Sequence, residues 1–161
     1  MREILFRGKR VDNSEWSEGS YVHRTQFYGE DCPCDDHFIL SGGEFHCDYY
    51  NAHEIIPETL GQFTGLTDKN GKRIFEGDIV RVKGSESDEN YKDYDEIGKA
   101  VFVDGAFLIE VPKEYNGMKH YSKIHSYYMT IADWVTREVV GNCFDNAELL
   151  TAERIGENER I

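Results

Sequence analysis

The sequence contains no apolar run close to the roughly 18 residues that cross a membrane, which argues against a transmembrane helix. Its first residues, Met1 to Arg7, include three charged side chains and lack the long apolar centre of a signal peptide. Cysteine is also scarce, with 4 among 161 residues. Without a secretory signal, we expect these cysteines to be reduced thiols or metal ligands, and the protein to be cytoplasmic.

Basic residues are few as well, because 18 Lys and Arg stand against 31 Asp and Glu, for a formal net charge of −13. No Lys or Arg occurs from Thr25 to Asp68. An acidic surface repels the phosphates of nucleic acids and attracts proteins rich in Lys and Arg, although it can also be merely solvated. We single out four acids of this stretch as candidates for partner binding: Asp35, Asp36, Glu44 and Asp48.

The basic residues that do occur leave a nucleic-acid function open as an alternative. Four of them follow one another in a short part of the chain and would form the contact: Lys69, Lys72, Arg73 and Arg81. The acidic stretches offer a second version of this alternative, in which they mimic nucleic acid and bind its partner proteins. Direct binding of nucleic acid is the weaker expectation, because phosphate contacts depend on many more cations.

The residues that are plentiful favour strands. Hydrophobic residues make up 39% of the chain and aromatic residues 13%, which supports a folded core. Turn residues recur every 8–12 positions, among them Asn70-Gly71 and Asp104-Gly105, the dipeptides most typical of tight hairpins. Short strand-like segments lie between the turns, at 4–11, 15–22, 38–40, 44–49, 63–66, 74–75, 79–83, 100–103, 106–111 and 127–130. The sequence therefore predicts an all-β protein with little helix.

The remaining segments are predicted to form loops, one helical turn and a charged tail. The charged segment 84–98 begins and ends with glycine and predicts a mobile surface loop, and 115–123 is polar and turn-like. A polar, cysteine-bearing loop is expected around 31–34. Asn146 to Leu150 predict one helical turn, and the tail 151–161 is charged without an apolar face.

Three segments together resemble the YopX family of phage and prophage proteins. The first is REILFRGK at 2–9 with EWSEGSY at 15–21, and the second is PETLGQFTGLTDKNGKRIFEGDIV at 57–80. The third is VGN at 140–142 with NAELL at 146–150. They occur in order over roughly residues 1–150, and the second block is long enough to be specific.

The resemblance implies a fold of two packed β subdomains, the second similar to a small barrel of the Src-homology-3 type. We expect residues 1–60 to form the first, a hairpin-rich subdomain with a Cys/His loop, and 61–150 the second. It implies no catalytic residues. The chain is thus expected to be a non-enzymatic accessory protein in the cytoplasm of a bacterial host, which binds a phage or host protein.

A zinc site is the remaining alternative. Six Cys and His side chains fall within 22 positions, namely Cys32, Cys34, His37, His46, Cys47 and His53. Tetrahedral zinc needs about four such ligands, but Cys-x-Cys is tighter than the usual spacing. Residues 46 and 47 would also point to opposite faces of a strand. We therefore expect no cofactor. The sequence likewise contains no nucleophile elbow and no glycine-rich phosphate loop.

Overall fold

The structure is a computed structural model, and it describes residues 3–27, 33–42, 52–86, 92–115, 118–123 and 136–151. The chain forms two compact units, residues 1–65 and residues 66–161. All the regular elements described are strands apart from two short 3₁₀ helices, so the predicted all-β class is confirmed. No helix in these residues has the length and hydrophobicity that a membrane span requires.

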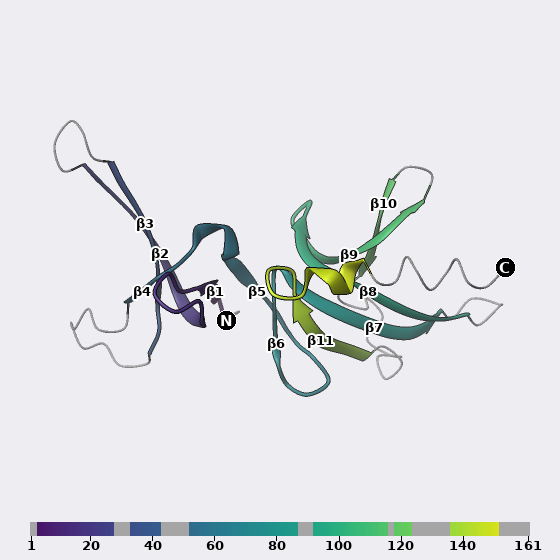
Figure 1. Cartoon of the computed structure of the whole chain (residues 1–161). Coiled ribbons are helices and arrows are strands. Elements are labelled where there is room, and N and C mark those ends of the chain that lie inside the picture. Colours follow the sequence, from purple (N-terminus) through teal and green to yellow (C-terminus); the bar gives the residue numbers. More distant parts are fainter. Residues whose placement is uncertain are drawn as a thin grey trace. The chain divides into compact units, whose positions relative to one another are not determined.

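The first unit is built from antiparallel hairpins (Figure 1). Its elements are β1 (Phe6–Lys9), β2 (Trp16–Phe27), β3 (Pro33–Leu40), β4 (Ala52–Glu54), the 3₁₀ helix η2 (Pro57–Thr59) and β5 (Gly61–Thr67), within which the boundary between the units falls. These strands belong to a sheet with the order β4-β3-β2-β1-β5-β6, whose last strand, β6 (Arg73–Phe75), belongs to the second unit. The turn at Asp12 to Ser14, which lies between the predicted strand segments 4–11 and 15–22, closes the β1–β2 hairpin, where the Arg10 N–H donates to the Glu15 carbonyl.

Two isoleucines are buried in the first unit: Ile39 on β3 and Ile55 after β4. Gly8 on β1 faces Ile55 so closely that a β-carbon there would lie 2.6 Å from the Ile55 Cδ1 atom. Gly19 on β2 is likewise pressed against the backbone of Leu40. Glycine at these two positions therefore allows β1 to approach Ile55 and β2 to approach the backbone of β3 at Leu40.

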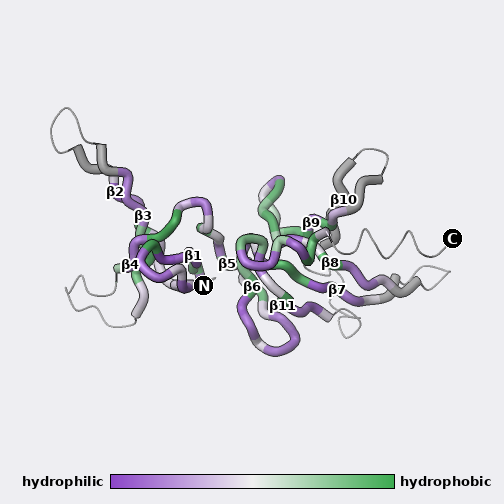
Figure 2. The backbone as a smooth tube through the Cα atoms, viewed as in Figure 1, coloured by the Kyte–Doolittle hydropathy of each residue, from purple (hydrophilic) through white to green (hydrophobic). Residues whose placement is uncertain are grey.

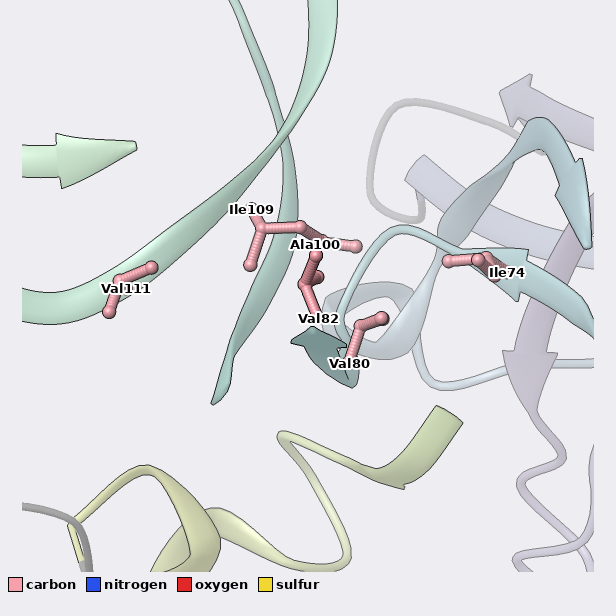
Figure 3. Packing of buried hydrophobic residues seen from close by; sticks show 6 residues of the cluster. All are labelled: Ile74, Val80, Val82, Ala100, Ile109 and Val111. Atoms are coloured by element: carbon pink, nitrogen blue, oxygen red, sulfur yellow. The ribbon is translucent and has the colours of Figure 1, made fainter. Parts of the chain in front are cut away.

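The second unit holds a five-stranded antiparallel sheet with the order β10-β9-β8-β7-β11. Its elements are β6 (Arg73–Phe75), β7 (Asp78–Glu86), β8 (Lys92–Val103), β9 (Ala106–Tyr115), β10 (Met118–Lys123), β11 (Thr136–Asn142) and the 3₁₀ helix η4 (Ala147–Leu150). Its core is the aliphatic cluster drawn in Figure 3: Ile74, Val80, Val82, Ala100, Ile109 and Val111. Because side chains alternate across a strand, Val80 and Val82 share one face of β7 while Arg81 lies on the other.

The glycine turns of the second unit have the predicted conformations. Asp104 and Gly105 both have positive φ, 50° and 81°, and Val103 pairs with Ala106 around them, as in a two-residue type I′ turn. Gly71, with φ 81°, closes the turn between β5 and β6, which is hydrophilic in Figure 2. The Asp68 carboxylate accepts hydrogen bonds from the backbone N–H groups of Asn70 and Lys72 and so fixes this turn.

Three predictions about local structure are wrong. Residues 84–86 and 92–98 are paired strands, with Gly84 opposite Tyr94, rather than a surface loop. Residues 118–123 form β10 instead of a turn. Finally, β2 continues past Val22 to Phe27, and β3 already begins at Pro33. In each case polar residues lie in paired strands, whose backbone hydrogen bonds offset the low strand propensity of polar side chains. The predicted strands at 44–49 and 127–130 lie outside the described residues.

Candidate functional site: the two faces of the β2–β3 ribbon

The β2–β3 ribbon is the hairpin that brings most of the candidate residues together. Its register pairs Tyr21 with Ile39, His23 with His37 and Thr25 with Asp35. Successive residues of a strand point to opposite faces, so these positions share one face of the ribbon. Val22, opposite Phe38, and Arg24, opposite Asp36, belong to the other face. The ribbon therefore presents two surfaces of different chemistry.

The histidine face consists of Tyr21, His23, Asp35 and His37. The two imidazole rings stack nearly parallel, with centroids 4.5 Å apart and planes at 11°. The Tyr21 hydroxyl oxygen lies 2.6 Å from His37 Nδ1, and the Tyr21 ring also stacks on His37. One Asp35 oxygen contacts His23 Nε2, and the other lies 3.8 Å from His37 Nε2. One carboxylate thus faces both imidazoles.

Asp35 is held in its charged form by this arrangement. The hydrogen bond from His23 lowers the pKa of Asp35 below its ordinary value of 3.8, and the nearby His37 acts in the same direction. The side chain is exposed, with 67% of its surface open to solvent, so screening by water weakens the interaction. At neutral pH the histidine face therefore presents an ionised carboxylate between two imidazole rings.

The outer face consists of Val22, Arg24, Asp36, Phe38, Leu40 and Glu54. Val22 and Leu40 are unusually exposed for aliphatic residues, at 39% and 44%. The Arg24 guanidinium lies over the Phe38 ring, 5.2 Å from its centroid, and pairs with Asp36 at 2.6 Å. Glu54 on β4 lies opposite Phe38 and is exposed. This face combines apolar side chains with a charged border, which is the composition of a protein-binding surface.

The structure regroups the predicted metal ligands. Of the six candidates, His37 joins the cluster on the histidine face. His53 lies on β4 opposite Ile39, outside that cluster. The backbone of Cys34 lies on β3 opposite Gln26. Cys32, His46 and Cys47 lie outside the described residues, so the cysteine part of the predicted site stays a prediction.

Two of the predicted acidic contacts lie on the ribbon, one on each face. Asp35 is on the histidine face and Asp36 is on the outer face, whereas Glu44 and Asp48 lie outside the described residues. Asp35 has a hydrogen-bond partner in His23, and Asp36 forms an ion pair with Arg24. The negative charge of Asp36 is therefore offset within the ribbon.

The four cations of the nucleic-acid alternative lie in the second unit. Lys69 pairs with Glu138 at 2.7 Å, and Arg81 makes a two-pronged ion pair with Asp95 at 2.6 and 2.7 Å. Lys72 and Arg73 are exposed near the β5–β6 turn. The charges of Lys69 and Arg81 are therefore offset by carboxylates, which weakens both residues as phosphate contacts.

Sequence reasoning missed His23, Arg24 and Val22 as functional candidates. The predicted strand ends at Val22, so His23 and Arg24 are not expected on any strand. The sequence does contain a pattern that could have identified them. Tyr21, His23 and Thr25 occupy alternate positions, and so do Asp35, His37 and Ile39. Two such segments around one polar turn predict a hairpin with polar residues on a common face.

Comparison with known proteins identifies the family. The family model described as "YopX protein" matches residues 5–151, which is most of the chain. The chain belongs to the YopX family. Among solved structures, this YopX protein is similar to a crystal structure of protein EF1440 from Enterococcus faecalis, with 21% sequence identity and a TM-score of 0.45 over 93% of this chain and 99% of that one. No curated protein matches it.

Proposed function

We propose that this YopX protein is a non-enzymatic accessory protein of a phage or prophage, which acts by binding a basic protein partner through the outer face. The observation that carries the proposal is the exposure of Val22 and Leu40 on a sheet face bordered by charged residues. Exposed aliphatic side chains on neighbouring strands, enclosed by polar ones, form the centre-and-border pattern of protein interfaces.

Charge complementarity supports a basic partner. The chain carries a net charge of −13, and no Lys or Arg follows Arg24 until Lys69. Arg24 itself is paired with Asp36, so Glu54 leaves the border of the outer face negative. Lys- and Arg-rich proteins would be steered toward such a surface, with an association rate that falls as salt rises.

The test is affinity capture from bacterial cells that carry the phage or prophage, followed by titration of the purified captured protein. Val22→Asp combined with Leu40→Asp removes the apolar centre of the outer face, and we expect it to weaken binding by about tenfold or more. Phe144→Asp, at an equally exposed hydrophobic residue of the second unit, is the matched control and should leave binding unchanged.

A second comparison isolates the charges. Neutralising Asp35, Asp36, Glu44 and Asp48 together should slow association without unfolding the protein, and raising salt above about 0.15 M should act in the same direction. Capture that persists in the Val22→Asp/Leu40→Asp variant, or that disappears on nuclease treatment, contradicts the proposal. The latter result would favour the nucleic-acid alternative.

A further inference from the structure

We propose that the histidine face is a zinc-binding site formed by His23, Asp35 and His37. Each residue offers one ligand atom, and these three atoms all lie within 4.8 Å of one another. Two imidazole nitrogens and a carboxylate oxygen are the donor set that Zn²⁺ accepts in sites with one open position. The inference goes beyond the proposed function, because it uses the opposite face of the ribbon.

The backbone already holds the ligands in place. His23 and His37 are directly opposed across an antiparallel pair, and Asp35 lies two residues along β3 from His37 on the same face. Such neighbours on one face of a sheet have Cβ atoms about 4.5–8 Å apart, within reach of a shared ion. Both strands are paired along this stretch, so binding the metal would not require the backbone to be ordered first.

The distances fit zinc after small rotations. Zinc–nitrogen bonds of about 2.0–2.1 Å at tetrahedral angles put neighbouring ligand atoms about 3.3 Å apart. His37 Nε2 lies 3.8 Å from the nearer Asp35 oxygen, and the His23 ring approaches the other oxygen directly. The His23 and Asp35 side chains are 44% and 67% exposed and have room to adjust. The stacked imidazoles would separate slightly as both nitrogens turn toward the ion.

Tyr21 supplies the orienting contact that metal-bound histidines usually have. Its hydroxyl lies 2.6 Å from His37 Nδ1. When Nδ1 carries the ring hydrogen and donates it to this oxygen, the lone pair of Nε2 faces Asp35, which is the tautomer required for binding through Nε2. Tyr21 in turn packs against Phe6, with ring centroids 5.6 Å apart, so the contact is anchored in the first unit.

This ligand set differs from the cysteine-rich one that the sequence suggested. It shares only His37 with that set and adds His23 and Asp35. Carboxylate and imidazole groups can bind a metal in both oxidising and reducing conditions, whereas thiolates are lost when cysteine is oxidised. The two sets can be distinguished by substitution.

The experiment is calorimetric titration of the full chain, without a polyhistidine tag, with ZnCl₂ at neutral pH. We expect one Zn²⁺ to bind per chain and the melting temperature to rise with zinc concentration. His23→Ala, His37→Ala and Asp35→Ala should each weaken binding by about tenfold or more, and Tyr21→Phe by about tenfold through loss of the orienting contact. His53→Ala, on the same sheet, is the matched control and should change the affinity by less than about twofold.

Two further measurements guard against misfolded variants. In the wild-type chain, Zn²⁺ should shift the imidazole resonances of His23 and His37 and leave those of His53 in place. The combined Cys32→Ser, Cys34→Ser and Cys47→Ser variant should retain its zinc. Failure of wild-type protein to bind zinc saturably would overturn the proposal. So would binding that survives His23→Ala and His37→Ala but is lost in the cysteine variant.

Discussion

At the scale of single residues, buried and paired carboxylates hold the second unit together. Asp78 is 1% exposed and accepts a hydrogen bond from the Phe75 N–H at 2.8 Å and another from the Asn142 side-chain amide at 3.2 Å. It thereby joins the turn before β7 to the end of β11. Asp68 plays a comparable part, since its other oxygen accepts the N–H of Val139. Both acids lie inside the second family block, where the sequence indicated turn chemistry.

The first prediction concerns Asp78. Asp78→Ala leaves the buried Phe75 N–H without its acceptor, so we expect the free energy of unfolding to fall by about 1–3 kcal/mol. Urea denaturation followed by circular dichroism measures the change. Asp12→Ala, at an exposed carboxylate paired with Arg10, is the control and should have little effect. Equal losses in both variants would contradict the structural role of Asp78.

The second prediction concerns the pKa of Asp95. The Arg81 hydrogen bonds, helped by Lys83 at 2.9 Å, lower this pKa from 3.8 to about 2. A carboxyl group whose pKa is lower in the folded than in the unfolded chain stabilises the fold at pH values above its unfolded pKa. That stabilisation is lost as the pH falls through the folded pKa of about 2. Arg81→Ala should raise the Asp95 pKa toward 3.8 in a carboxyl carbon NMR titration. Arg10→Ala, a control in the first unit, should leave it unchanged.

At the scale of elements, the hairpin turns were predictable because their chemistry is local. Asn70-Gly71 and Asp104-Gly105 favour tight turns through their own backbone preferences, without help from distant residues. Both glycines have the expected positive φ. The pairing of β7 with β8, which includes residues 84–86 and 92–98, was not predictable in this way. Its strands carry Arg81, Lys83 and Asp95, which stabilise one another only once the two strands are paired. His23 was missed for the same reason, since a register between strands is not encoded in either strand alone.

The third prediction tests the β8–β9 turn. A β-carbon at Gly105 would meet nothing within 4 Å, so the cost of substitution there is conformational rather than steric. Gly105→Val should lower the free energy of unfolding by about 1 kcal/mol or more, whereas Gly105→Asn should cost less because Asn tolerates positive φ. Thermal denaturation compares the two. If Asn and Val were equally destabilising, the type I′ assignment would be wrong.

At the scale of the whole molecule, membership of the YopX family and the all-β class follow from the sequence, whereas the binding partner does not. The family blocks are rich in turn residues and buried positions such as Asp78 and Ile79, which specify architecture. A partner, by contrast, is selected by surface residues such as Val22 and Leu40, whose exposure becomes evident only when the strands are placed. The similarity of the second subdomain to a Src-homology-3 barrel stays a prediction.

The fourth prediction follows from the overall charge. With a net charge of −13, and with Lys69 and Arg81 paired to carboxylates, the chain should not bind duplex DNA at physiological salt. Fluorescence anisotropy of a labelled duplex measures this directly. Tight binding that weakens with salt and is lost in Lys72→Glu/Arg73→Glu would instead assign the protein to the nucleic-acid class.

The alternation along β2 also has an evolutionary consequence. Neighbouring residues such as Val22 and His23 belong to different surfaces, so point substitutions can change either surface while the other is conserved. Insertion or deletion of a single residue within β2 would shift its register against β3 and exchange the two surfaces over the rest of the strand. Homologues should therefore tolerate many substitutions in this ribbon but very few changes in the length of its strands.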